Sequence, residues 1–404
     1  MKRYNLPIIG CILFFCLAFS SLKAQNANFT TDGRTNVINS AVPFLRIAPD
    51  SRGGALGDAS IAASPDANAT FWNPSKLAFV DHEVGGSVSY VPWLRQIVPD
   101  MSLSYLSFYN RIDNLSAFAF SLRYFSLGDV QFTDQFGTDL LNFTPNEFAI
   151  DGTYARKLSD QFSIGVSFRF IHSNLSGSTP LEGGQETSPG NAVAGDLSAY
   201  YETNTFQTGN LNSKLSFGAN ISNIGSKITY TDEANRDFIP INLGIGVAYS
   251  IQIDDYNEFT ILYDANKLLV PTPPIYDAEQ TDEDGNFLIT SGRDPDVPVF
   301  TGMIQSFYDA PGGLSEELNS IMHSVGLEYV YDKQFALRTG MFYEHPTKGN
   351  RQFVTAGLGV KFSVAAIDFS YLFAINSPTA VETSPLQNTL RFTLSANINE
   401  LGKK

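Results

Sequence analysis

Large apolar residues alternate with small or polar residues along most of the chain after residue 80. Segment 162–170 shows the pattern most clearly, because every even position there is large and apolar. Segments 241–252 and 390–398 repeat it. Successive side chains of a strand point to opposite faces, so a period of two predicts strands with two different faces.

The alternation predicts fourteen strands of about ten residues each. A tilted strand of that length crosses a bilayer, and bacterial outer-membrane barrels contain even numbers of strands. After the N-terminal segment no run of about 18 apolar residues occurs, which excludes a helical membrane protein. The predicted strands are 84–93, 101–110, 115–126, 147–156, 161–172, 193–202, 213–223, 239–252, 257–266, 323–332, 334–344, 352–362, 364–375 and 388–398.

Short and long links between these strands alternate, as in barrels with periplasmic turns and external loops. The exceptions are an overlong periplasmic link, 203–212, and a short external one, 94–100. The tight links are 110–114, 157–161, 252–257, 332–333 and 363. The long links, all predicted on one side, are 127–146, 173–192, 224–238, 267–322, 345–351 and 376–387.

The alternative is a soluble β-protein, which would carry Lys and Glu on its polar face. In the three segments quoted above only Arg169 and Arg391 are charged. A small-residue face fits a filled lumen, and an apolar face fits lipid. We therefore expect an all-β protein, an antiparallel transmembrane β-barrel of about fourteen strands.

Composition agrees with this fold class. Only 17% of the 404 residues are charged, whereas soluble domains have about 25%. The chain has 41 acidic and 26 basic residues, a formal charge of −15. This acidic balance argues against a nucleic-acid partner, which requires a basic surface.

Residues 1–24 have the charged, apolar and small-residue parts of a secretory signal peptide. A membrane anchor is the alternative, but the apolar run 6–19 is shorter than the roughly 20 residues that span a bilayer. Cleavage after Ala24 removes three of the 26 basic residues and no acid, which leaves 23 basic against 41 acidic residues, a charge of −18. Cleavage also removes Cys11 and Cys16, the two cysteines of the chain, which excludes disulfides from the mature protein.

Residues 25–80 do not show the strand pattern. They contain the sequences GGALGDA at 53–59 and FWNPSKLA at 71–78. A lumen lined with small residues has room for such a segment, so we expect 25–80 to form a plug or hatch inside a barrel of residues 81–399. A flexible periplasmic tail is the alternative.

The two sequences resemble the N-terminal region of the PorV family, outer-membrane barrels of the type IX secretion system of Bacteroidetes. That family is similar to the FadL group of fatty-acid transporters, whose hatch carries an Asn-Pro-Ala motif; here Ser75 departs from it. The resemblance covers essentially the whole chain. It places the plug motif at Gly53, Gly54, Gly57, Asp58, Trp72, Asn73 and Pro74.

The resemblance implies an integral outer-membrane protein that shuttles secreted cargo. Its implied partners are the C-terminal signal domains of cargo proteins, the giant translocon barrel, a sortase-like attachment protein, and outer-membrane lipid and lipopolysaccharide. The alternative function is FadL-like transport of hydrophobic small molecules, which needs an apolar pocket and a route past the plug.

Catalytic and metal-binding motifs are missing from the sequence. It contains no G-x-S-x-G, H-E-x-x-H or P-loop, and its four histidines form no i, i+4 pair. The acidic stretch 282–286 resembles part of a calcium loop without its terminal Glu. We expect no enzymatic activity, no cofactor and no metal.

The link 267–322 is the longest external segment. It begins with prolines, is acidic, and is expected to contain a short helix at 315–322. Its aromatic residues either form a protein-docking surface or pack the loop over the barrel mouth, and the same two possibilities hold for link 127–146. The candidates are Tyr276, Phe287, Phe300, Phe307 and Tyr308 in the first link and Phe132, Phe136 and Phe143 in the second.

Overall fold

The computed structural model describes residues 35–95, 98–133, 139–175, 177, 187–231, 236–281, 287–375, 386 and 388–398. The predicted signal peptide, 1–24, and the first part of the predicted plug, 25–34, lie outside the described residues.

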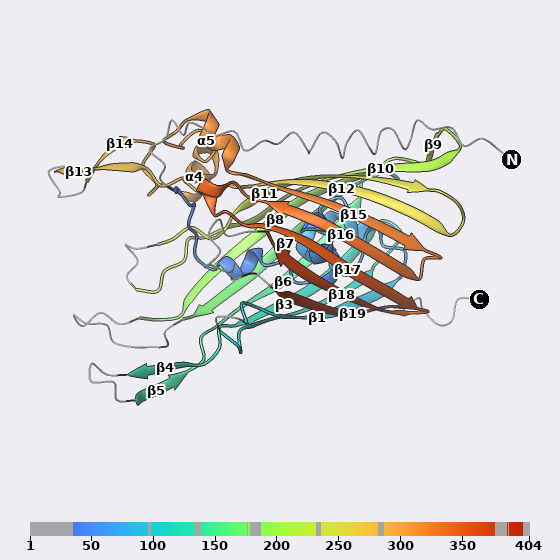
Figure 1. Cartoon of the computed structure of the whole chain (residues 1–404), viewed down its shortest axis with the longest axis horizontal. Coiled ribbons are helices and arrows are strands. Elements are labelled where there is room, and N and C mark those ends of the chain that lie inside the picture. Colours follow the sequence, from blue (N-terminus) through green and yellow to red (C-terminus); the bar gives the residue numbers. More distant parts are fainter. Residues whose placement is uncertain are drawn as a thin grey trace. The chain divides into compact units, whose positions relative to one another are not determined.

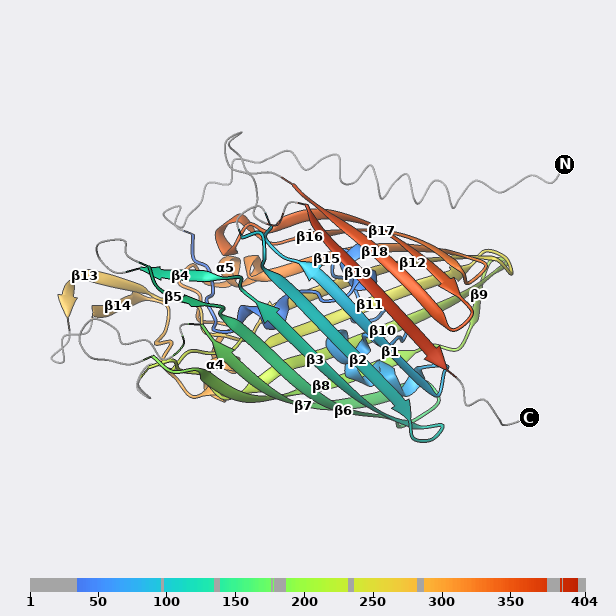
Figure 2. The ribbon, with the colours of Figure 1, turned by 90° about the horizontal axis from the view of Figure 1, so that it is seen from below.

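Fourteen antiparallel strands form a closed barrel (Figures 1 and 2). It closes because β1 pairs with β2 on one side and with β19 on the other, which confirms the predicted fold class. The barrel strands are β1 (Val84–Pro92), β2 (Ser102–Arg111), β3 (Ser116–Ser126), β6 (Asn146–Lys157), β7 (Phe162–Asn174), β8 (Gly190–Glu202), β10 (Leu211–Gly225), β11 (Asn242–Gln252), β12 (Asn257–Leu268), β15 (Ile321–Tyr331), β16 (Phe335–Tyr343), β17 (Gln352–Phe362), β18 (Ala365–Ala374) and β19 (Thr389–Ile398).

Short and long links lie at opposite ends of the barrel (Figure 1). We call the end with the long links the outer end. The link 203–210 is long for a turn because β9 (Phe206–Thr208) pairs with the beginning of β10 and extends the hairpin. The tight turns at the other end are 112–115, 158–161, 253–256, 332–334 and 363–364.

The outer end carries elements that the alternation did not predict. Two hairpins, β4–β5 and β13–β14, project from it in both views (Figures 1 and 2). The predicted helix 315–322 is displaced, because Ile321 already begins β15. The additional elements are β4 (Val130–Thr133), β5 (Asp139–Phe143), β13 (Ile275–Thr281), β14 (Phe287–Ser291), α4 (Val299–Gln305), α5 (Leu314–Asn319) and η3 (Pro346–Lys348).

The predicted beginning of β11 at residue 239 is wrong, because the strand begins at Asn242. Pro240 has no N–H to donate to a ladder. The Ile241 N–H donates instead to the Ile239 carbonyl at 2.8 Å, a three-residue turn that precedes the strand.

The two faces of the barrel wall differ as the sequence predicts. On β7, Phe168 is 65% exposed on the outside, while its neighbours Ser167 and Arg169 are buried inside. The outward apolar side chains thus form a surface suited to lipid. None of the helices in the described parts of the chain is long and apolar enough to cross a membrane.

The segment 43–80 fills the interior of the barrel. Its elements are η1 (Pro43–Arg46), α2 (Ser51–Ala55), α3 (Ala69–Trp72) and η2 (Pro74–Phe79), seen in blue within the ribbon of strands (Figure 2). The helix α2 contacts strands β16 to β19, and η2 contacts β3 and β6 to β8. We refer to 43–80 as the plug segment. The predicted boundary at residue 25 stays a prediction.

Candidate functional site: the plug and the outer loops

The Gly-rich sequence at 53–59 begins in α2, where the helix packs tightly against Trp72 of the plug and Arg391 of β19. The Asp50 side chain caps α2 by accepting from the Gly53 N–H at 2.7 Å, and its other oxygen accepts from Trp72 Nε1 at 2.7 Å. A Cβ on Gly53 would lie 2.4 Å from the Trp72 ring, and one on Gly54 2.6 Å from Arg391. The motif glycines therefore permit contacts that larger residues would block.

Gly57 and Asp58 turn the chain after α2. Their φ angles are +66° and +65°, in the left-handed region that favours glycine. A Cβ on Gly57 would lie 2.4 Å from the backbone nitrogen of Met341 on β16. The plug backbone therefore lies directly against the wall at this point.

The sequence Asn73-Pro74-Ser75 fastens the plug to the opposite wall. The Asn73 Nδ2 donates to the carbonyls of Ile61 in the plug and Ala199 in β8, at 3.0 and 3.1 Å. Its Oδ1 accepts from the N–H of Ser75 and so caps η2, whose first residue is Pro74. The Ser75 N–H also donates to Ser198 Oγ on β8 at 3.0 Å.

Ion pairs of buried and half-buried side chains join the plug and the wall strands. Arg52 contacts Asp66 within the plug and Glu328 on β15, both at 2.9 Å. Arg338 on β16 also contacts Glu328, at 2.6 Å. Each of these charges has a partner, as burial requires.

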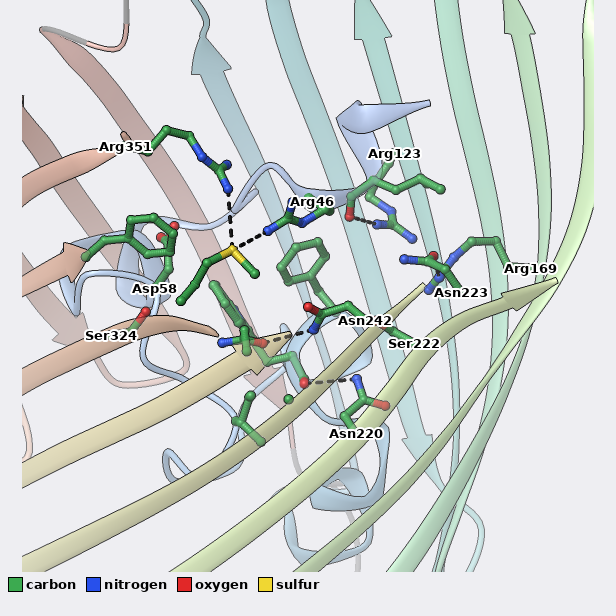
Figure 3. A pocket seen from close by; sticks show the side chains of 18 residues that line it. Arg46, Asp58, Arg123, Arg169, Asn220, Ser222, Asn223, Asn242, Ser324 and Arg351 are labelled. Carbon is green, nitrogen blue, oxygen red and sulfur yellow. Dashed lines mark hydrogen bonds between the residues drawn. The ribbon is translucent and has the colours of Figure 1, made fainter. Parts of the chain in front are cut away.

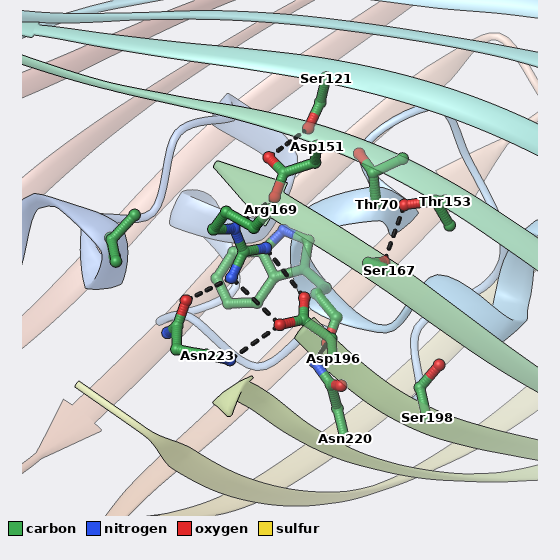
Figure 4. A network of polar contacts seen from close by, with 12 residues as sticks. Thr70, Ser121, Asp151, Thr153, Ser167, Arg169, Asp196, Ser198, Asn220 and Asn223 are labelled. Carbon is green, nitrogen blue, oxygen red and sulfur yellow. Dashed lines mark hydrogen bonds and ion pairs between the residues drawn. The ribbon is translucent and has the colours of Figure 1, made fainter. Parts of the chain in front are cut away.

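A second charged network lies on the inner faces of β6, β7 and β8 (Figure 4). Arg169 donates to Asp151, to Asn223, and to Asp196 at 2.9 Å from its Nη2. Asn223 lies at a register shift of β10 against β8, with φ +61°, and its Nδ2 donates to the Pro240 carbonyl. The irregularity in the wall is therefore closed from the inside by hydrogen bonds.

A cavity of about 100 Å³ remains between the plug and the wall (Figure 3). Its lining mixes charged and apolar side chains, because four guanidinium groups and the carboxylate of Asp58 lie beside aromatic residues such as Phe71 and Phe342. The four arginines are Arg46, Arg123, Arg169 and Arg351. The volume lies below the roughly 300–1,000 Å³ that is usual for pockets of small-molecule ligands.

The helices of link 269–320 expose apolar side chains. On α4, Phe300 is 71% exposed and Ile304, one turn later, is also exposed, although Val299 and Met303 pack against the core. On α5, Leu314 is 75% exposed and Leu318 lies exposed one turn away, while Glu316 and Glu317 are buried. A surface helix ordinarily turns its apolar stripe inward, so α5 is reversed.

Acidic side chains fasten α5 to the barrel. Glu316 contacts Lys348 at 2.6 Å, and Glu317 contacts Lys267 at 2.8 Å. Burial raises the pKa of Glu316, but hydrogen bonds from Lys348 and the Gly312 N–H outweigh it, so the pKa of this carboxyl lies below its ordinary value. The charged face of α5 is therefore the anchored face.

The five predicted aromatic residues of this link all have exposed side chains. Tyr276 and Phe287 lie on the hairpin β13–β14, Phe300 on α4, and Phe307 and Tyr308 directly after it. We call these five, together with Ile304, Leu314 and Leu318, the outer apolar surface. Its role as a docking surface stays a prediction.

The second predicted aromatic group is described only in part. Phe132 pairs with Leu141 in the hairpin β4–β5, and Phe143 at the end of β5 is half-buried. Phe136 and the acidic stretch 282–286 lie outside the described residues. Within the described residues, no group of three or more His, Cys, Asp or Glu side chains is arranged to hold a metal.

Sequence reasoning missed α4, the leucines of α5 and the charged network. Leu314 and Leu318 stand four residues apart around two glutamates, a helical signal available in the sequence. The pairing of Asp151 with Arg169 had no such signal, because it depends on the register of β6 against β7.

Solved structures with low sequence identity resemble the barrel. The toluene transporter TbuX of Ralstonia pickettii is 14% identical, with a TM-score of 0.45 over 87% of this chain and 98% of TbuX. The Pseudomonas putida toluene transporter TodX is 13% identical, with a TM-score of 0.46 over 88% of this chain and 99% of TodX. A FadL homologue of Pseudomonas aeruginosa is 13% identical, with a TM-score of 0.42 over 87% and 99% of the two chains.

No curated protein sequence matches the chain. The model of the family described as Type IX secretion system protein PorV matches residues 30–275, more than half of the chain. That match includes both plug motifs and the barrel strands from β1 to β12. The chain therefore belongs to the PorV family, the outer-membrane β-barrel proteins of the type IX secretion system.

Proposed function

We propose that this protein is a non-catalytic adaptor of the type IX secretion system that binds the C-terminal signal domain of secreted cargo through its outer apolar surface. It receives cargo at the translocon barrel and passes it to a sortase-like attachment protein. Family membership supports the secretion role. The binding role rests on the reversed helix α5 and on the exposed apolar side chains of α4.

The reversed orientation of α5 is the observation that carries the proposal. Its glutamates are held by Lys267 and Lys348, so the helix cannot rotate to bury Leu314 and Leu318 without breaking two ion pairs. Exposed apolar patches are typical of protein interaction sites, and Leu314 and Leu318 lie one turn apart on the exposed side of α5. A folded partner domain that covers these residues would remove them from water.

The interior of the barrel supports an adaptor over a transporter of hydrophobic molecules. The inner cavity holds only about 100 Å³, and four of its lining residues are arginines. The plug is fastened on opposite sides, at Gly57 against β16 and at Asn73 against β8. An apolar molecule would have to displace these contacts to pass.

The test is a pull-down with the full-length protein in detergent. The double variant Phe300→Ser/Ile304→Ser removes the apolar face of α4 and is expected to reduce capture of an isolated cargo signal domain at least tenfold. In cells, the same variant is expected to leave cargo unattached.

The matched control is Ile112→Ser/Leu158→Ser. Both residues are exposed and apolar, but they lie in tight turns at the opposite end of the barrel. This control should bind like the wild type. Equal capture by both double variants would show that α4 is not part of the binding site. Uptake of a labelled fatty acid that depends on this protein would favour transport instead.

A further inference from the structure

Two cavities share a three-residue partition at the outer end of the barrel. The inner cavity, about 100 Å³, lies beneath it, and an outer cavity of about 230 Å³ lies above it. The outer cavity is lined in part by Ser320 and by the link that carries η3, at Glu344, Lys348 and Gly349. The partition residues, which line both cavities, are Arg46, Met322 and Arg351.

The partition brings two guanidinium groups to one neutral sulfur atom. Arg46 Nη2 donates to Met322 Sδ at 2.8 Å, and Arg351 Nη2 donates to the same atom at 3.5 Å (Figure 3). A thioether is a weak acceptor, and two like charges repel each other when they converge. The sulfur therefore supplies no negative charge to either guanidinium group.

The two arginines differ in how they are neutralised. Arg351 forms a bidentate pair with Glu344, at 2.8 and 2.9 Å. Among the described residues, Arg46 makes no ion pair, and Met322 is its hydrogen-bond partner. Lys348, which lines the outer cavity, is already paired with Glu316. Arg46 is thus the cation of the partition that lacks a direct counterion.

The inner cavity contains donors and acceptors that have no hydrogen-bond partner within the described part of the chain. The hydroxyl of Ser324 and the Nε of Arg123 lack an acceptor, whereas the Oδ1 atoms of Asp58, Asn220 and Asn242 lack a donor. These oxygens disfavour an anion deep in the inner cavity. The partition differs, because Arg46 lacks a direct counterion there, which matches a single negative charge.

We propose that the partition is a binding site for one small monovalent anion, either a halide or a small carboxylate, held by Arg46 and Arg351. The anion enters from the outer cavity and accepts hydrogen bonds from both guanidinium groups in place of the Met322 sulfur. Methionine is flexible enough to move aside. The site is independent of cargo binding, because it uses no residue of the outer apolar surface.

The test uses the full-length protein in detergent and measures the temperature at which the folded barrel converts to the unfolded form on a gel. Chloride is titrated against a bulky sulfonate, the anion of the buffer, at constant ionic strength. We expect a saturable rise of several degrees with chloride, and acetate titrated in the same way distinguishes a carboxylate from a halide. A saturable response to either probe supports the site.

Three variants make the result specific. Arg46→Met should abolish the saturable response, whereas Lys214→Met, which removes an exposed cation on β10, should keep it. Met322→Leu removes the competing sulfur, keeps both guanidinium groups and should respond at lower chloride. In crystals soaked in bromide, an anomalous peak is expected within hydrogen-bond distance of Arg46.

Two results would overturn the proposal. The first is a wild-type response to both probes that is linear or missing, as expected if water alone fills the partition. The second is an equal response in Arg46→Met and the wild type.

Discussion

The short distance between the plug and the barrel wall explains why glycine stands at several positions of both. Ideal Cβ positions on Gly340 and Gly357, on strands β16 and β17, would lie 2.1 Å from the carbonyl carbon of Leu56 and 2.4 Å from the Cβ of Ala55. Glycine on the wall and glycine in the plug motif therefore act together. The backbone contact they allow would be lost with any side chain.

We predict that Gly57→Ala destabilises the folded barrel more than Gly209→Ala. Both glycines have left-handed φ angles, +66° and +63°, but a Cβ on Gly209 meets nothing within 4 Å. The conformational cost of alanine, about 1–2 kcal/mol, is therefore common to both. The overlap with Met341 should add about 1–3 kcal/mol at Gly57 only.

The measurement is the free energy of unfolding in urea for both variants in the same detergent. Equal losses of stability would mean that the plug does not press on β16 at this position.

The interactions that hold the elements of the outer end in place differ from those that hold the barrel strands. The barrel strands are fixed by continuous ladders and by lipid on one face, whereas α5 is fixed largely by ion pairs of Glu316 and Glu317. Its apolar residues face outward and contribute little to its anchoring. The attachment of α5 to the barrel should therefore depend on pH.

We predict that α5 is released in acid. The pKa of Glu316 lies below its ordinary value when α5 is anchored, so the released form binds a proton more readily. The stabilisation is complete above about pH 4.3, the ordinary Glu pKa, and is lost as the pH falls through the lower pKa of the anchored state. Pepsin cleavage next to Leu314 or Leu318, normalised to an unfolded reporter, should accelerate only in that acid range.

The variant Glu316→Gln serves as the comparison. It has no charge to lose, so its cleavage rate should be high already at pH 5 and change less in acid. A wild-type rate, normalised to the reporter, that already rises between about pH 6 and about pH 5 would contradict the assignment to Glu316, whose pKa is lower.

The whole molecule is a wall with lipid outside and a plug inside. Charges are few on the outer face of the strands, and those on the inner face occur in pairs such as Arg169 with Asp196. This division explains why only 17% of the residues are charged. A charged residue introduced on the outward face should therefore destabilise the barrel in a membrane.

We predict that Phe168→Arg makes the free energy of folding into lipid vesicles less favourable by about 2–4 kcal/mol. This is the cost of a lipid-facing arginine near the bilayer midplane. Phe168 is 65% exposed on the outward face of β7. The control Ile112→Arg places the same charge in a tight turn, where the cost should be about 0–1 kcal/mol. Urea titration of folding into vesicles measures both, and equal costs would show that Phe168 does not face the hydrocarbon.

The sequence by itself determined the barrel. Alternation is a local property, because each strand must show one face to lipid and the other to the lumen, so all fourteen strands could be found from their own residues. The plug sequences at 53–59 and 71–78 were equally visible, since they need glycine, asparagine and proline at fixed positions. The outer link was predictable in length but not in form, because neither lipid nor the lumen imposes a period on it.

Only the tertiary structure decided which residues meet. Asp151 faces Arg169 because of strand register, and Arg46 of the plug meets Arg351 of a link some 300 positions away. The outward direction of Leu314 and Leu318 follows from two ion pairs to β12 and to η3. Such contacts join residues far apart in the chain, and no pattern along one strand or helix specifies them.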